Sequence, residues 1–224
     1  MRKLPYIQTA IMFLLPLFGW TTSAQALMGK ISVTVHEQGS NTPQPSRAWV
    51  QIDGTRYYKP LTKSCTIYLR DRSFSCDGKF LIEVPASRGI VHIERGKEYF
   101  PVDQKVVVSE NRTTQVDIIM KRWVNMAKEG WYSADMHCHF GRDDINILKQ
   151  TALADDVNLE PVLWIWLTYR SPPDQDLTWP EKSSVYADPT HLITFRNQEI
   201  ERIGGESFES VGALLMSGLN KPVQ

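Results

Sequence analysis

The sequence lacks the features that mark several common functional classes. Its 25 basic and 25 acidic residues balance and form no basic block, so it carries no electrostatic footprint for nucleic acid. It has no Gly-x-Ser-x-Gly elbow, no phosphate-cradling glycine loop and no reactive-cysteine motif. Nucleophilic catalysis by serine or cysteine therefore has no support. Internal repeats and low-complexity tracts are also absent from the sequence.

Long apolar runs are missing beyond the first 26 residues, so no stable membrane span is expected once these are removed. Residues 1–26 have the pattern of a secretory signal peptide. Arg2 and Lys3 provide the charged start, residues 7–20 are largely apolar, and Ala24 and Ala26 form a small-x-small cleavage site. A retained membrane anchor is the alternative. Export predicts a periplasmic or extracellular location, which is oxidising.

Only three cysteines are present. Cys65 and Cys76 flank a segment expected to form a hairpin, and two interpretations stay open. They form a disulfide if the strands bring their Cα atoms close enough, or they are two unpaired thiols. Cys138 is expected to be a small buried hydrophobic residue, the alternative being a thiolate metal ligand.

Residues 27–122 predict an antiparallel β-sandwich. Short runs of alternating apolar and polar residues are separated by turn signals such as Asp53-Gly54 and Asp77-Gly78, and no helical period appears. The expected strands are 31–35, 48–52, 79–84, 90–95, 105–108 and 113–120.

Residues 128–224 have a different pattern, with a boundary expected near 121–128. A helix is predicted at 145–154, followed by an almost wholly apolar strand at 161–168. With an extended segment before them, these elements make a βαβ unit, which places ligand sites at the carboxyl ends of its strands. Residues 169–189 are expected to be a loop over that end, and two interpretations of its aromatic residues stay open. Trp179 and Tyr186 line a substrate cleft, or they are packed side chains of an irregular surface loop. His191 is interpreted as a residue at the start of a strand rather than a metal ligand.

The segment from Gly130 to His139 contains the most informative motif. In an extended chain, successive side chains point to opposite faces, so Asp135, His137 and His139 share one face and Cys138 lies on the other. One carboxylate and two imidazoles at the end of a strand form half of a divalent metal site.

This motif resembles the first metal-binding motif of the PHP (polymerase and histidinol phosphatase) superfamily, and is most similar to its secreted CehA/McbA-like branch. The stretch Ile193 to Arg202 is similar to the second motif, in which a strand delivers a glutamate, here Glu199. The resemblance implies a distorted α/β barrel with two or three Zn, Mn or Fe ions. It also implies that His137, His139 and Glu199 bind metal, and that Asp135 binds directly or orients a ligand.

The preceding domain is similar to carboxypeptidase regulatory-like β-sandwiches, on the residues 76–80, 84–85 and 95–99. The resemblance implies a scaffold or a docking surface for this part of the chain. The fold expected overall is thus a β-sandwich at 27–122 followed by a PHP-type α/β domain at 128–224.

The second domain departs from the PHP pattern in one respect. A further histidine usually follows the glutamate, but the stretch 210–219 has none, and the later ligands of the pattern would lie beyond Gln224. The α/β part is therefore expected to be incomplete, in a truncated chain or a fragment of a longer hydrolase.

The function expected is hydrolysis of a phosphoester, ester or amide bond in a small substrate by metal-activated water, with Asp135 and Glu199 as catalytic groups. The alternative is a non-catalytic secreted binding protein that uses its sandwich and has a degenerate metal site.

Overall fold

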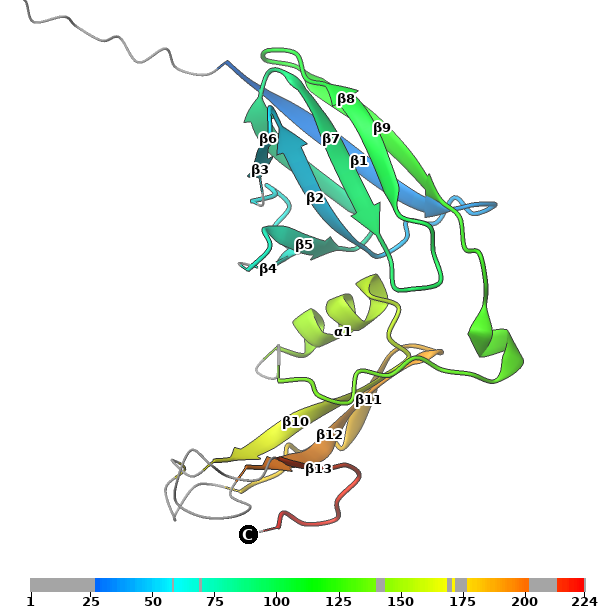
Figure 1. Cartoon of the computed structure of the whole chain (residues 1–224), viewed down its shortest axis with the longest axis vertical. Coiled ribbons are helices and arrows are strands. Elements are labelled where there is room, and N and C mark those ends of the chain that lie inside the picture. Colours follow the sequence, from blue (N-terminus) through cyan, green and yellow to red (C-terminus); the bar gives the residue numbers. More distant parts are fainter. Residues whose placement is uncertain are drawn as a thin grey trace, which may run out of the picture.

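The computed structural model describes residues 27–57, 59–68, 70–139, 144–168, 171, 177–201 and 213–223. The signal peptide expected at 1–26 lies outside these residues. Most of the described chain is β-strand, arranged in several sheets, and α1 lies between a sandwich and a second sheet (Figure 1). Among the described residues no helix is long and apolar enough to cross a bilayer.

The first half of the chain forms a β-sandwich. One sheet has the order β6-β1-β9, and the other has the order β4-β5-β2-β7-β8, with β3 paired to β2. The strands are β1 (Met28–Glu37), β2 (Ser46–Ile52), β3 (Thr55–Tyr57), β4 (Thr66–Tyr68), β5 (Ser73–Cys76), β6 (Lys79–Pro85), β7 (Arg88–Glu94), β8 (Val102–Val107) and β9 (Thr113–Met120).

Alternation in the sequence places the sandwich core as expected. Along β2 every second residue is buried, and the buried set joins those of β1, β6, β7 and β9 between the two sheets. Asp53 and Gly54 both have positive φ, which is the geometry of the two-residue turn that links twisted antiparallel strands. The hairpin expected at 65–76 is also present, as β4 and β5.

One pairing corrects the prediction of an antiparallel sandwich. β1 pairs with β9 in parallel, from Lys30 opposite Thr113 to Glu37 opposite Met120. The alternation of apolar and polar residues along a strand determines which side chains face the core, but it contains no information on the direction of the neighbouring strand. The first and last strands of the sandwich therefore close one sheet side by side.

The second half of the described chain contains one mixed sheet and one helix. After the short 3₁₀ helix η1 (Met126–Glu129) come α1 (Ile145–Ala154), β10 (Leu159–Leu167), β11 (Ser184–Asp188), β12 (His191–Ile200) and β13 (Leu214–Met216). β10 and β12 are parallel, whereas β11 and β13 pair antiparallel with β12.

The expected βαβ unit is present in outline. The segment carrying the histidine motif is not a regular strand, but isolated parallel bridges join Ala134 to Leu159 and Cys138 to Val162. α1 begins after the Asp144 side chain, which accepts a hydrogen bond from the Asn146 backbone N–H. It buries Leu148 and Ala152 against the sheet. The described residues form an open sheet and not a barrel.

The region expected to be a loop at 169–189 contains a strand. β11 lies within it and pairs with the start of β12, with Tyr186 opposite Leu192. Its residues alternate between exposed and half-buried. The strand therefore lacks an apolar run like the one from which β10 was predicted. Pairing with β12, a tertiary contact, stabilises it instead.

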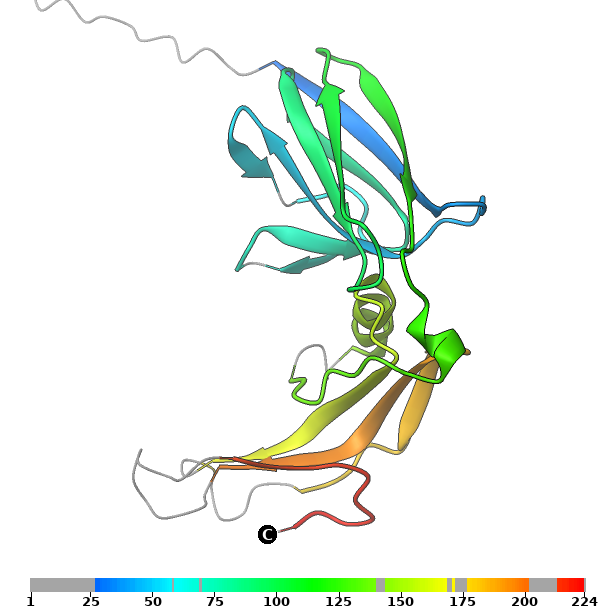
Figure 2. The same cartoon turned by 45° about the vertical axis from the view of Figure 1, so that its right-hand side comes forward.

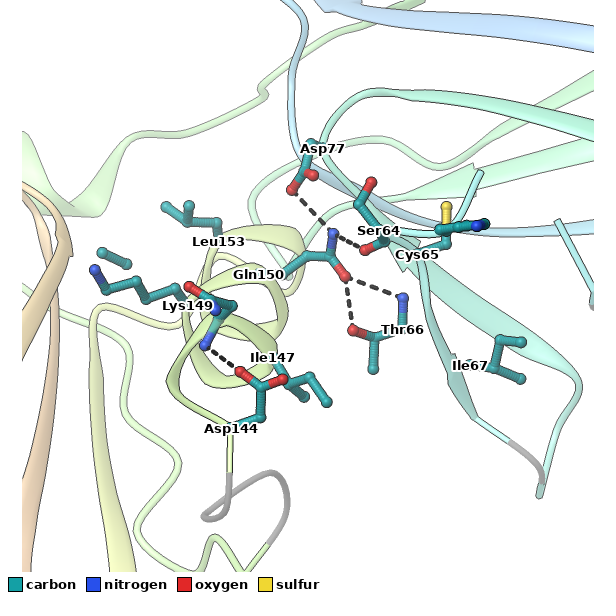
Figure 3. Close-up of a pocket in the computed structure, with 13 residues that line it drawn as sticks. Ser64, Cys65, Thr66, Ile67, Asp77, Asp144, Ile147, Lys149, Gln150 and Leu153 are labelled. Atoms are coloured by element: carbon teal, nitrogen blue, oxygen red, sulfur yellow. Dashed lines mark hydrogen bonds between the residues drawn. The ribbon is translucent and has the colours of Figure 1, made fainter. Parts of the chain in front are cut away.

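α1 connects the two halves because it packs on β5 and β4 of the sandwich as well as on β11 and β12 (Figure 2). Its Gln150 is buried and makes four hydrogen bonds to the β4–β5 hairpin (Figure 3). Gln150 Oε1 accepts from the Thr66 backbone N–H and hydroxyl, at 3.0 and 2.7 Å. Gln150 Nε2 donates to the Ser64 carbonyl at 2.6 Å and to Asp77 Oδ1 at 3.0 Å.

A buried charge cluster forms the second connection. Arg95, at the end of β7, donates to Asp156 Oδ1 at 2.7 Å and to the carbonyls of Pro45 and Leu153. Asp156 Oδ2 also lies 3.2 Å from Arg122 Nη2. The neighbouring Gly96 has φ +48°, and a Cβ there would lie 2.7 Å from the Asp155 carbonyl oxygen. Glycine thus permits the close approach that this cluster requires.

Candidate metal centre

Three side chains from separate parts of the sequence meet at one end of the second sheet. His137 and His139 end the segment that runs parallel to β10, and Glu199 is the penultimate residue of the parallel strand β12. The carboxyl ends of parallel strands meet at one edge of a sheet, where ligands bind in such folds. The site expected from the sequence motif therefore assembles where the topology predicts it.

The distances define a compact group of possible metal ligands. His137 Nε2 lies 3.3 Å from Glu199 Oε1, and His139 Nε2 lies 2.6 Å from Glu199 Oε2. One ligand atom of each of the three residues lies within 4.8 Å of the others. Two ligands at about 2.1 Å from a tetrahedral ion lie roughly 3.4 Å apart. The His137–Glu199 spacing matches this value, whereas the His139–Glu199 hydrogen bond is shorter and must open to admit an ion.

Glu199 provides the physical test of whether the group suits a cation. Its side chain is 1 % exposed, and among the described residues Oε1 makes no hydrogen bond, although His137 Nε2 lies 3.3 Å from it. A buried carboxylate oxygen without a partner is costly unless a cation or a donor compensates it. Two imidazoles with one carboxylate are a ligand set suited to Zn, Mn or Fe. The residues present therefore fit a divalent metal.

Asp135, expected to share the metal face, is not part of this group. Its Oδ1 accepts a hydrogen bond from the His137 backbone N–H at 3.0 Å, so it fixes the local bend of the segment that carries the histidines. Of the two roles expected for Asp135, the geometry favours orienting a ligand over binding metal.

Trp166 of β10 is a neighbour that the sequence motif did not single out. It pairs with Glu199 in the parallel register, and its ring centroid lies 4.9 Å from that of His139. Trp166 is 43 % exposed, so the ring forms an aromatic wall beside the ligands. The signal available in the sequence was its position near the end of a strand parallel to β12.

Cys138 is buried beneath the site, as expected for a residue pointing away from the histidines. Its thiol donates a hydrogen bond to Glu160 Oε1 at 2.9 Å. Burial raises the pKa of Glu160 to about 6, against the opposing effect of this hydrogen bond, and the charges of Asp135 and Asp155 add to the increase. Sequence reasoning missed Glu160 because it lies within an apolar strand with no motif around it.

Two other residues considered as candidates lie away from the group. Tyr186 is opposite Leu192, seven residues along β12 from Glu199, or roughly 23 Å at the rise of a strand. It therefore does not line a cleft at the metal group, which corrects the expectation. His191 begins β12, as expected, and is buried in the charge cluster. The position of Trp179 in a cleft stays a prediction.

Comparisons with known proteins add little to this geometry. No protein-family model matches the chain, and no curated protein matches it. Weak structural similarity extends to the minor pilin GBS52 of Streptococcus agalactiae, with 13 % identity, a TM-score of 0.34, and coverage of 45 % of this chain and 47 % of that one. The Bacillus anthracis TIE protein is similar at 9 % identity and a TM-score of 0.32, over 43 % of this chain and 17 % of that one.

A DUF3823 family protein from Parabacteroides merdae is similar at 15 % identity and a TM-score of 0.27, over 44 % of this chain and 48 % of that one. The chain spans less than half the length of each of these three proteins. Similarities of this size carry no argument about function. The case for a metal centre therefore rests on the chain's own residues.

Proposed function

We propose that this chain is an exported metal-dependent hydrolase of the PHP type, or a part of one, and that His137, His139 and Glu199 hold its divalent ion. The observation that carries the proposal is the convergence of these three side chains, whose possible ligand atoms lie within 4.8 Å of one another around the buried carboxylate of Glu199. The signal-like pattern of residues 1–26 supports export.

The chain's own residues have distinct roles in this proposal. His137 and His139 present their Nε2 atoms, and Glu199 presents a carboxylate group that is 1 % exposed. Trp166 packs against the His139 ring and limits its movement, and Asp135 holds the backbone between the two histidines. When bound, a divalent ion would lower the pKa of a coordinated water towards neutrality and polarise the scissile bond.

The number of ligands supports catalysis over a purely structural metal. Catalytic zinc sites use three protein ligands and keep one position for water or substrate. Among the described residues the group has three ligands, and two of them are accessible, with side-chain exposures of 54 % for His137 and 32 % for His139. Substrate thus reaches the ligands from the solvent side. Phosphoesters, esters and amides are the bonds that such a site would hydrolyse.

The proposal predicts stoichiometric metal in the purified chain. We expect elemental mass spectrometry to find about one Zn, Mn or Fe per chain, and the His137→Ala/His139→Ala variant to lose it. The matched control is His36→Ala/His92→Ala, which removes two histidines of the sandwich and should leave the metal content unchanged. Circular dichroism would verify that each variant is folded.

Hydrolysis of phosphoester, ester and amide substrates would then be compared in the same three proteins. A folded parent chain that takes up none of the three metals after dialysis against them contradicts the proposed site. A chain that binds metal through His137 and His139 but hydrolyses none of the substrates would instead favour the non-catalytic sandwich binding protein.

A further inference from the structure

The register of the β4–β5 hairpin places two cysteines opposite each other. Thr66 pairs with Ser75, Ile67 with Phe74 and Tyr68 with Ser73. Each antiparallel step lowers one residue number by one and raises its partner's by one, so the next pair outward is Cys65 with Cys76. The strands as assigned end at Thr66 and Cys76, and the Cys65 N–H bonds to the Thr62 carbonyl, so this alignment is a continuation of the hairpin register.

The contacts of Gln150 independently show that the two ends of the hairpin lie close together. Its Nε2 donates both to the Ser64 carbonyl and to Asp77 Oδ1, at 2.6 and 3.0 Å (Figure 3). Ser64 and Asp77 are the pair that follows Cys65 and Cys76 in the register. The two cysteines thus lie between the paired residues Thr66 and Ser75 on one side and two residues joined through Gln150 on the other.

Both cysteine side chains are on the core side of the hairpin. Cys76 is fully buried in the sandwich core, and Cys65 packs against that same core. Residues directly opposite in an antiparallel pair have Cβ atoms about 4.5–5.5 Å apart. A disulfide requires about 3.5–4.5 Å, so a small adjustment of the hairpin end is sufficient.

We propose that Cys65 and Cys76 are joined by a cross-strand disulfide once the chain meets a disulfide donor, as it would in an oxidising compartment. Both are thiols in this structure, and Cys76 donates to the Ser46 carbonyl with Sγ and oxygen 3.5 Å apart. The inference does not depend on the metal centre. Cys138, bound to Glu160 in the other half of the chain, is outside the pair.

The reaction is a thiol–disulfide exchange in two steps. The thiolate of one cysteine attacks the donor's disulfide, forming a mixed disulfide and releasing one donor thiol. The second cysteine then attacks the mixed disulfide, so the Cys65–Cys76 bond forms and the second donor thiol leaves. Two electrons pass to the donor, and the two protons lost by the cysteines are taken up by its two thiolates.

Burial determines when this exchange takes place. It raises the pKa of Cys65 to about 12, with a further increase from the nearby Cys76, and raises that of Cys76 to about 12 as well. Thiols with such pKa values are almost entirely protonated at neutral pH and react slowly. The bond therefore forms while the hairpin is still open during folding, and it resists reduction afterwards.

Peptide mapping under non-reducing conditions tests the inference. The full chain would be refolded in a buffer of oxidised and reduced glutathione, alkylated at its free thiols and digested with trypsin. Cleavage after Lys63, Arg70, Arg72 and Lys79 gives peptides 64–70 and 73–79, one with each cysteine. We expect these two peptides to appear joined, with a mass two hydrogens below their sum.

Peptide 129–142 is the internal control, and its Cys138 should be recovered as an alkylated free thiol. Reduction, or Cys65→Ser, should lower the melting temperature of the chain by roughly 5–10 °C. Alkylation of both Cys65 and Cys76 without reductant would overturn the inference. A bond from either of them to Cys138, to glutathione or to a second chain would overturn it equally.

Discussion

His191 shows how a residue that attracts attention as a metal ligand can serve the junction between the two halves of the molecule. Its side chain is 4 % exposed, with Nδ1 2.8 Å from Asp188 Oδ1 and Nε2 3.4 Å from Asp156 Oδ1. Asp156 also faces Arg95 and Arg122. Burial disfavours the charged imidazole, but the two carboxylates outweigh burial and raise the pKa of His191.

This environment predicts a pH dependence of stability with a definite sign. Because the folded pKa of His191 lies above its unfolded value of 6.5, its stabilisation is complete below pH 6.5 and is lost as pH rises through the folded value. The pKa values of Asp156 and Asp188 are lowered despite burial, chiefly by hydrogen bonds with His191. Their contribution is therefore present above pH 3.8 and is lost as pH falls through the folded values.

We therefore expect His191→Gln to cost more unfolding free energy at pH 5.5 than at pH 8.5, as measured by urea unfolding at both pH values. Asn158→Ala is the control, because it removes uncharged hydrogen bonds to Ser133 and Thr190 at the same junction. Its cost should be the same at both pH values. Equal costs of His191→Gln at the two values would contradict the assignment.

The sequence alone predicted those residues of the metal group that form a short motif. The His137 and His139 pair is a short motif, and its in-phase spacing was sufficient to find it. Glu199 required the family resemblance, because a lone glutamate in a strand gives no signal of its own. Trp166 was missed because only the parallel register of β10 with β12 brings it beside Glu199, and Glu160 because only the parallel bridges of the histidine segment to β10 bring it to Cys138.

At the scale of elements, α1 depends on a polar side chain as well as on its apolar face. Both polar atoms of the Gln150 amide group are hydrogen-bonded, to four atoms on three residues of the β4–β5 hairpin and its ends. An amide with every hydrogen bond made is compatible with burial, whereas an incomplete set is costly. The helix is thereby fixed to the sandwich in one position along its axis.

Gln150→Leu should destabilise the chain by about 2–3 kcal/mol, since it leaves the buried backbone N–H and hydroxyl of Thr66 without their acceptor. Urea unfolding followed by circular dichroism would measure the loss. Asn146→Ala changes an exposed residue of the same helix and should cost less than about 0.5 kcal/mol. Equal effects of the two variants would refute a special role for Gln150.

Helices and strands could be predicted where the pattern of apolar and polar residues within the segment itself was sufficient. α1, β10 and the alternating strands of the sandwich follow from periodicity within single segments. β11 and the parallel pairing of β9 do not, because each depends on a partner strand that is distant in sequence. A half-buried strand such as β11 has no apolar run to distinguish it from a loop.

For the whole molecule, the Arg95–Asp156 pair joins the sandwich to the second sheet. Both side chains are at least 92 % buried, with exposures of 4 % and 8 %. Removing one member of a buried ion pair leaves an uncompensated charge, which typically costs about 3–5 kcal/mol. The pair is thus a strong constraint on how the two halves dock, even if its net contribution to stability is small.

Arg95→Met should lower the unfolding free energy by at most about 3–5 kcal/mol, since Asp156 keeps Arg122 and His191 as neighbours. If Arg95 and Asp156 are coupled, the loss in the double variant with Asp156→Asn should be smaller than the sum of the two single losses. Arg112→Met, at an exposed arginine of the sandwich, should change it by less than about 0.5 kcal/mol. Urea titrations of the parent chain, the single variants Arg95→Met and Asp156→Asn, their double variant and Arg112→Met would show the pattern. Additive losses in the double variant would mean that the two side chains are not coupled.

The parallel pairing of β1 with β9 has a consequence for the order in which the chain folds. Residues 30–37 pair with residues 113–120. One edge of β1 therefore stays unpaired until a strand about 80 residues later in the sequence has been synthesised. Contacts between such distant segments form slowly, because a long loop must close first. During synthesis on the ribosome, β1 therefore presents an open edge until β9 emerges. This interval is the period in which the nascent sandwich is most exposed to pairing with other chains.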